Sequence, residues 1–135
     1  DTTEDATLFT DAVLKQYHAI VFLNTTGDVL NNVQQVALER YIQSGGGFMG
    51  IHAATDCEYN WPWYGMLAGA YFLDHPSSPS NVQNGRFEVA VKNSFATMGM
   101  PDQFERKDEF YNFKNINPAI NVLVKPNLSV GASPG

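Results

Sequence analysis

The feature that most constrains the fold is a strand, helix and strand pattern between residues 19 and 51. Residues 18–23 (HAIVFL) form a continuous apolar run, which is typical of a strand that is buried on both faces. A helix is predicted from about residue 32 to residue 44, because Asn31 and Gln34 have the spacing of a capping box.

Three glycines at 45–47 end this helix, and residues 48–51 (FMGI) then form a second short buried strand. A connection of this kind joins parallel strands in nearly all known cases. The sequence therefore predicts an α/β fold in which parallel strands near 19–24 and 47–52 are adjacent in one sheet.

The rest of the chain gives weaker signals. Thr10 is a predicted N-cap of a first short helix, and Trp61-Pro62 is a typical helix entry with proline at the first helical position. Further predictions are a loop over 74–85, a strand with one solvent-facing side over 86–92, strands over 108–113 and 121–124, and an irregular tail over 127–135.

Composition indicates one folded domain over residues 1–135. The chain is 44% hydrophobic and 16% charged, far from the composition of disordered chains. Its net charge is −6 and its basic residues are scattered, so we expect no nucleic-acid partner. The strongest apolar run, residues 19–23, is much too short to cross a bilayer, and we expect no membrane span.

The single cysteine, Cys57, excludes an intramolecular disulfide and any site with several cysteine ligands. Residues 1–7 are acidic and polar and do not form a signal peptide. The sequence leaves the compartment open between the cytoplasm and export after removal of an upstream signal. It also leaves homo-oligomerisation open.

In open parallel sheets, ligands bind outside the carboxyl ends of the strands. Asn24 and Thr25 follow the first predicted strand, and the segment from His52 to Asp56 follows the second. His52 is the sharpest of these signals, because it follows Gly-Ile at a strand end and precedes two alanines, and small residues there favour an abrupt turn. The imidazole could serve as a general base, an acid or a metal ligand, or it could be a structural group satisfied by local hydrogen bonds.

Three further groups are candidates with a structural alternative. Asp74-His75-Pro76 pairs a carboxylate with an imidazole, although an Asx-type turn is favoured. Asp108 and Glu109 point to opposite faces of a predicted strand, with Tyr111 on the face of Glu109, and an ion pair with Arg106 or Lys107 is equally plausible. Trp61 could stack on a sugar, although a core position is favoured.

Four motifs occur together in an order that resembles the ThuA-like, or trehalose-utilisation, family. They are residues 21–30 (VFLNTTGDVL), 45–56 (GGGFMGIHAATD), 61–64 (WPWY) and 108–113 (DEFYNF). The resemblance runs from about residue 1 to about residue 124. It implies a flavodoxin-like three-layer sandwich with a mostly parallel sheet, like that of the class I glutamine amidotransferases.

The resemblance also implies that this chain is the central part of the family domain, without terminal elements. Family members often carry His-Pro where this chain has residues 94–97 (SFAT), and a C-terminal Gly-His motif is absent here. In the amidotransferases a nucleophilic cysteine occupies the strand-to-helix elbow. His52 stands at that position here, so glutamine amidotransferase chemistry is not expected.

The function implied by the resemblance is carbohydrate utilisation, on trehalose or a related disaccharide. The enzyme hypothesis is a sugar-processing hydrolase or lyase that uses His52 and Glu109 as acid and base. The ligand-binding residues would be Asn24, Thr25, Asp56, Trp61, His75, Asp108 and Tyr111. The rival hypothesis is a non-catalytic carbohydrate-binding or assembly domain.

The enzyme hypothesis predicts that His52 and Glu109 meet in one crevice at the carboxyl edge of the sheet. No cofactor is expected. A divalent metal held by His52, His75 and a carboxylate is a weaker variant, because no short ligand spacing such as His-x-x-x-His supports it.

Overall fold

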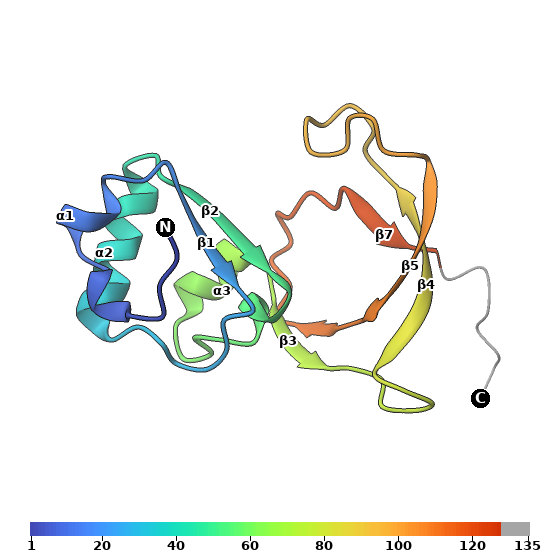
Figure 1. Ribbon diagram of the computed structural model, residues 1–135, viewed down its shortest axis with the longest axis horizontal. Coiled ribbons are helices and arrows are strands. Elements are labelled where there is room, and N and C mark those ends of the chain that lie inside the picture. The colour runs from blue at the N-terminus through green and yellow to red at the C-terminus, as the bar shows by residue number, and fades with distance from the viewer. Residues whose placement is uncertain (128–135) are drawn as a thin grey trace. The chain divides into compact units, whose positions relative to one another are not determined.

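The computed structural model describes residues 1–127, which form two compact units (Figure 1). Unit 1 comprises Asp1–Phe72 and Phe113–Asn117, and unit 2 comprises Leu73–Asn112 and the described chain from Pro118 onward. The predicted tail lies outside the described residues except for Asn127, and the prediction of a single domain over 1–135 stays a prediction.

Unit 1 contains the predicted βαβ pattern. Strand β1 is Ala19–Leu23, helix α2 is Asn32–Gln43 and strand β2 is Gly47–Ile51. The two strands pair in parallel, with Ala19 opposite Gly47 and Leu23 opposite Ile51, which confirms the predicted adjacency. The remaining elements of unit 1 are the 3₁₀ helices η1 (Ala6–Leu8) and η2 (His52–Thr55) and the helices α1 (Asp11–Leu14) and α3 (Pro62–Ala68).

Local hydrogen bonds explain where α2 begins. The Asn31 side chain accepts hydrogen bonds from the backbone N–H groups of Val33 and Gln34, and the Gln34 side chain accepts one from the backbone N–H of Asn31. This is the predicted capping box. Thr10 likewise caps α1 by accepting a hydrogen bond from the N–H of Val13, as the sequence indicated.

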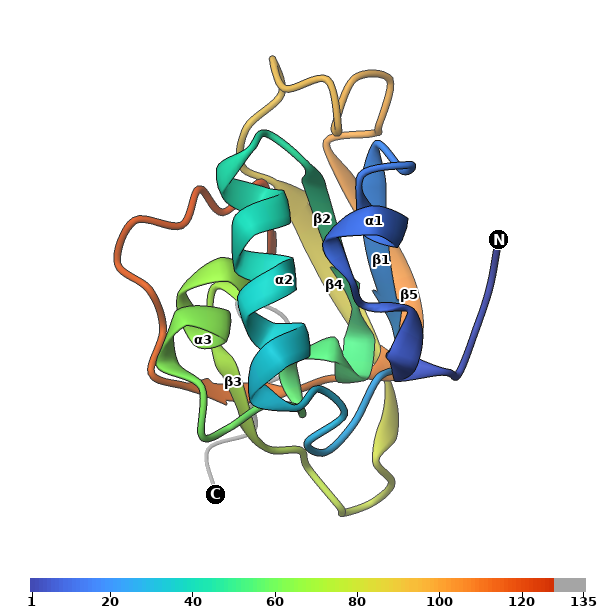
Figure 2. The same ribbon diagram turned by 90° about the vertical axis from the view of Figure 1, so that its left-hand side faces the viewer.

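The core of unit 1 lies on one face of the β1–β2 pair, the face that α2 covers in Figure 2. The Phe22 ring of β1 lies 5.4 Å from Phe48 of β2 and 5.7 Å from Tyr64 of α3, measured between ring centroids. Leu38 of α2 is completely buried in the same cluster. Burial of these apolar groups supplies most of the driving force for folding of this unit.

The prediction that the first strand is buried on both faces is wrong. Val21 is 50% exposed and Leu23 is 65% exposed, and Met49, which pairs with Val21, is 56% exposed. Alternate residues of a strand point to opposite sides, and the packed aromatic cluster lies on the Phe22 side. The apolar run therefore correctly predicted a strand, but the predicted burial of both its faces is wrong.

Unit 2 consists mainly of antiparallel strands. Strand β4 (Val82–Val89) pairs with β5 (Gln103–Glu109) and with β7 (Val124–Pro126), both in the antiparallel sense. Two short strands, β3 (Tyr71–Asp74) and β6 (Asn112–Lys114), pair with each other, and the boundary between the units passes through both. Among the strands described here, only β1 and β2 are shown paired in parallel, so the expected mostly parallel sheet is not observed.

The strand limits in unit 2 also differ from the predictions. Strand β4 begins at Val82, inside the predicted loop, because the ladder to β5 extends as far as the pair of Val82 and Glu109. The predicted strand over 108–113 is divided, since β5 ends at Glu109 and β6 begins at Asn112. Pairing with a distant strand, which local alternation does not encode, sets these limits.

Candidate functional site

Two residues at the carboxyl ends of the parallel strands have an unusual backbone conformation. Asn24 follows β1 with φ of 52°, and His52 follows β2 with φ of 54°. They are neighbours in space, because Leu23 and Ile51 are paired and the Asn24 N–H donates a hydrogen bond to the Ile51 carbonyl at 3.2 Å. Left-handed conformations are uncommon for residues other than glycine, although Asn and His tolerate them better than most.

Both side chains of this pair are accessible to solvent, since Asn24 and His52 are exposed. Thr25 beside them is partly buried. His52 is not sealed inside the protein, and both readings of it, a functional imidazole and a structural group satisfied by local hydrogen bonds, stay predictions. The carboxyl ends of β1 and β2 thus present an amide and an imidazole side by side.

The loops behind this edge are tied together by backbone hydrogen bonds. The Gly27 N–H donates to the Asp56 carbonyl at 3.0 Å, and the Glu58 N–H donates to the Gly27 carbonyl at 3.2 Å. The Asp56 carboxylate accepts a hydrogen bond from the Tyr59 hydroxyl at 2.5 Å. Asp56 is therefore held in place next to η2, where a ligand at the strand ends could reach it.

Glu58, which the sequence analysis did not single out, organises this region. Its side chain is only 1% exposed. One carboxylate oxygen accepts the backbone N–H groups of Val29 and Leu30, each at 2.8 Å, and the other accepts the Gln35 side-chain amide at 2.8 Å. No local pattern could have indicated this role, because the donors lie more than twenty residues away in sequence.

Cys57 and Trp61 are structural residues. Burial raises the pKa of the Cys57 thiol to about 11, so the thiol stays protonated at neutral pH and is a poor nucleophile. Trp61 is 8% exposed, stacks on Trp63 and donates from its indole nitrogen to Glu39. Trp61 therefore has the core position that the sequence favoured, and its stacking on a sugar stays a prediction.

Unit 2 brings together several of the other predicted site residues. Glu109 is the last residue of β5, and one of its carboxylate oxygens lies 3.6 Å from His75 Nε2. The same oxygen accepts a hydrogen bond from the Asn81 side-chain amide at 2.7 Å. The His75 ring stacks on Tyr111, with ring centroids 6.3 Å apart and planes inclined by 22°. We call Asn81, His75, Glu109 and Tyr111 the Glu109 cluster.

Asp108 does not belong to the Glu109 cluster. Its carboxylate forms an ion pair with Arg106 at 2.6 Å and accepts the Glu109 backbone N–H at 3.0 Å. This is the ion-pair alternative that the sequence left open. Asn81 was missed because its contact with Glu109 depends on the antiparallel register of β4 and β5.

His52 lies in unit 1 and Glu109 in unit 2, and their meeting in one crevice stays a prediction. The metal variant stays a prediction as well. Within residues 1–127, no group of three or more His, Cys, Asp or Glu side chains is arranged to hold a metal ion. Within the same residues, no helix is long and apolar enough to cross a membrane.

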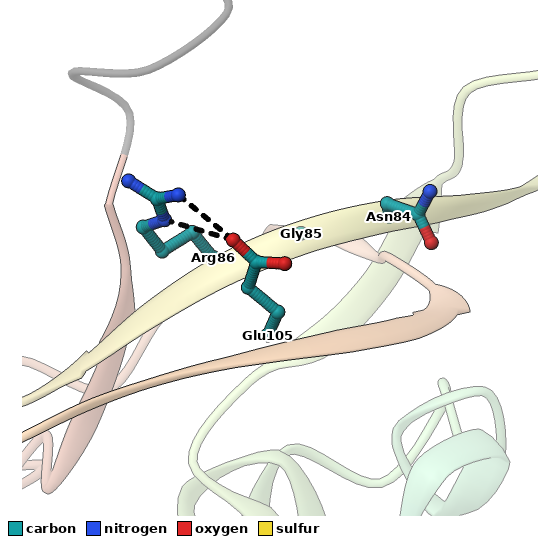
Figure 3. A pocket seen from close by; sticks show the side chains of 4 residues that line it. All are labelled: Asn84, Gly85, Arg86 and Glu105. Carbon is teal, nitrogen blue, oxygen red and sulfur yellow. Dashed lines mark hydrogen bonds and ion pairs between the residues drawn. The ribbon is translucent and has the colours of Figure 1, made fainter. Parts of the chain in front are cut away.

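A shallow hollow of about 160 Å³ lies on unit 2, lined by Asn84, Gly85, Arg86 and Glu105. Figure 3 shows that the Arg86 guanidinium reaches the Glu105 carboxylate across it, at 2.8 Å. None of the site residues predicted from the sequence lines this hollow. Its two charged groups already satisfy each other, so it is a weak candidate for a ligand site.

Comparison with known proteins agrees with the motifs. The profile of the ThuA family, described as trehalose utilisation, matches residues 1–132. Among solved structures, the chain is similar to a ThuA-like protein from Bacteroides uniformis, with 28% sequence identity and a TM-score of 0.79. The similarity covers 94% of this chain and 53% of that one, so the chain spans about half the length of this relative. No curated protein matches the chain.

Proposed function

Because the chain belongs to the ThuA family of trehalose utilisation, we propose that it is part of a carbohydrate-processing enzyme of the hydrolase or lyase type. His52 and Glu109 are the proposed acid and base, and Asn24, Asp56 and Tyr111 are proposed to orient sugar hydroxyls. Thr25 and His75 complete the proposed ligand-binding set. Trehalose or a related disaccharide is the proposed substrate.

The observation that carries this proposal is the pair of left-handed residues at the strand ends. Strained backbone conformations outside glycine cost about 1–3 kcal/mol each and are concentrated at functional sites. Asn24 and His52 adopt such conformations side by side, at the edge where ligands bind to parallel sheets. An amide and an imidazole at this edge could bind sugar hydroxyls and transfer a proton.

The Glu109 cluster supports the second half of the proposal. A general acid or base needs a titratable group that is fixed in position and still reached by substrate. The Glu109 side chain is 21% exposed and is held by Asn81 and His75. Acid and base catalysis contributes about 10²- to 10⁴-fold to rates in enzymes generally.

We also propose that β1 and β2 belong to a larger, flavodoxin-like parallel sheet in the whole protein. Parallel sheets are normally covered on both faces, and Val21, Leu23 and Met49 present an apolar surface on the open face. The Bacteroides uniformis relative is about twice as long as the match. Amidotransferase chemistry is not part of the proposal, since His52 stands at the elbow and Cys57 is buried.

The experiment is a screen of disaccharides and their derivatives for turnover and binding, using the whole protein in which this chain occurs. His52→Ala and Glu109→Gln should each lower turnover at least 100-fold while binding persists. Glu105→Gln is the matched control, because Glu105 lies on the same strand with its side chain 72% exposed.

Turnover that survives in both site variants would overturn the assignment of acid and base. Sugar binding without turnover in the wild-type protein would favour the rival function, a carbohydrate-binding or assembly domain. Absence of both binding and turnover across the screen would count against carbohydrates as ligands.

A further inference from the structure

A hydrogen-bond acceptor lies near each ring nitrogen of His75. His75 Nδ1 lies 3.2 Å from the carbonyl oxygen of Pro76, and Nε2 lies 3.6 Å from a carboxylate oxygen of Glu109. A carbonyl oxygen only accepts hydrogen bonds, and so does an ionised carboxylate. Both ring nitrogens therefore face acceptors, so an N–H on either nitrogen has an acceptor near it.

We propose that His75 and Glu109 form a proton-transfer pair and that Asn81 is the residue that positions it. This proposal rests on the proposed function and keeps Glu109 as the base, but it names His75 in place of His52 as the group that gives the proton to the substrate. In the pair, the protonated imidazole is the acid and the carboxylate is the base. Neither the motifs nor the family relationship assigns these roles to His75 and Asn81.

The proposed cycle conserves protons. In an elimination of the lyase type, the Glu109 carboxylate accepts a proton from a substrate C–H group, a C=C bond forms as the neighbouring C–O bond breaks, and His75 Nε2–H gives a proton to the leaving oxygen. Glu109 is then a neutral carboxylic acid and His75 a neutral imidazole. Transfer of the acid proton from Glu109 to Nε2 restores both groups; the two atoms are 3.6 Å apart, so this transfer requires closure to hydrogen-bond distance or one bridging water.

Asn81 fixes the carboxylate end of the pair. Its side-chain amide donates to the same Glu109 oxygen that faces Nε2, at 2.7 Å. Asn81 directly precedes Val82, and Val82 is the ladder partner of Glu109, so donor and acceptor are held by the same strand pairing. Groups held by a hydrogen-bond ladder keep the tight tolerances that proton transfer needs.

Stacking on Tyr111 restrains the other end of the pair. The imidazole and phenol planes are inclined by only 22°, which opposes rotation of the His75 ring. Both charged groups are partly open to solvent, with side-chain exposures of 34% for His75 and 21% for Glu109. A ligand could therefore reach them. The His75 ring is restrained by Pro76, Glu109 and Tyr111, which is more than an ordinary surface ion pair requires.

The first test measures geometry without any substrate. In NMR spectra of the protein, Glu109→Gln should move the side-chain amide resonances of Asn81, and Asn81→Ala should move the ring resonances of His75. Asn84→Ala is the matched control, because Asn84 is exposed on β4 and should leave His75 unchanged. Resonances of His75 that do not respond to Asn81→Ala would overturn the positioning role.

The second test separates binding from turnover once a sugar substrate is found. Asn81→Ala should lower kcat at least 10-fold with KM changed less than threefold, and Asn81→Asp, which places a like charge beside Glu109, should do the same. His75→Gln should lower kcat at least 100-fold. Circular dichroism of each variant identifies any loss of folding, and the isosteric Asn81→Asp replaces Asn81→Ala if the latter unfolds.

The two proposals can fail separately. If Glu109→Gln abolishes turnover while Asn81→Ala and His75→Gln retain it within twofold, the proton-transfer pair is refuted and the proposed function stands. If both Glu109→Gln and His52→Ala retain turnover, the proposed function fails, whatever the NMR measurements give.

Discussion

Unit 1 contains most of the buried apolar side chains, whereas in unit 2 the described residues with a buried side chain are Val89 and Thr97. The core cluster of unit 1 joins β1, α2 and α3 through Phe22, Leu38 and Tyr64. Unit 2 relies on a strand ladder with ion pairs across it, such as Arg86 with Glu105 and Lys125 with Glu88. Unit 1 is therefore maintained mainly by a buried core. Unit 2 is maintained mainly by strand pairing, surface ion pairs and half-buried aromatic contacts such as that of Phe87 with Phe104.

Because of this difference, the two parts of the proposed site are held rigid in different ways. Asn24 and His52 are attached to strands that pack on an apolar cluster. Glu109 is attached to an antiparallel ladder whose side chains are nearly all exposed or half-exposed. Substitutions of core residues in unit 1 should accordingly lower the free energy of unfolding much more than substitutions of surface residues in unit 2.

The largest effect is expected from Leu38→Ala in unit 1. Leu38 is fully buried, and removal of a buried leucine side chain costs about 2–5 kcal/mol because it leaves a cavity. Denaturant unfolding measures the change. Val33→Ala on the same helix is the control, since Val33 is 77% exposed and should cost less than about 0.5 kcal/mol. Equal effects of the two substitutions would contradict the picture of a packed unit 1.

Glu58→Ala should follow, with a loss of about 3 kcal/mol, because the N–H groups of Val29 and Leu30 would lose their acceptor. Glu58→Gln keeps one acceptor oxygen and should cost about half as much. Hydrogen exchange gives a local measurement, in which the amides of Val29 and Leu30 should exchange faster in Glu58→Ala. Unchanged exchange at these two amides would show that Glu58 does not hold the loop.

Alkaline pH should destabilise unit 1 through Cys57. Burial raises the pKa of its thiol from 9.0 to about 11, so above pH 9 the unfolded chain releases the proton and the folded chain retains it. Stability contributed by the protonated thiol is complete below pH 9 and is lost as pH rises towards 11, by about 2 kcal/mol. Burial also raises the pKa of Tyr64 and Tyr71, which acts in the same direction.

Thermal unfolding between pH 8 and pH 11 measures this effect, with Cys57→Ser as the comparison. The serine hydroxyl does not titrate in this range, so the variant should lose less stability with rising pH than the wild type does. Parallel pH profiles for the two proteins would refute the assignment to Cys57.

The smallest effect is expected from Arg86→Ala in unit 2. The ion pair with Glu105 is short, at 2.8 Å, but the two side chains are 40% and 72% exposed. Exposed ion pairs contribute about 0–1 kcal/mol, and salt weakens them further. Urea unfolding at low and high salt measures the change. A loss comparable to that of Leu38→Ala would mean that the two units do not differ in the way described.

Sequence determined the elements whose causes are local. The capping box at Asn31 and Gln34, the N-cap at Thr10 and the alternation of apolar and polar residues each depend on positions only a few residues apart. The parallel pairing of β1 with β2 was also predictable, because a helix of this length between two short strands leaves few other arrangements. The position of His52 after β2 followed from the same pattern.

Which side chains meet depends on the tertiary structure. The register of β4 and β5 brings Asn81 to Glu109, although 28 residues separate them, and folding brings His75 to the same carboxylate. The buried role of Glu58 likewise depends on donors contributed by a distant loop. A one-residue change of register would reverse the face of every side chain on a strand, and register is set by pairing partners and core packing rather than by local sequence. This is the physical reason why the elements could be predicted while the Glu109 cluster could not.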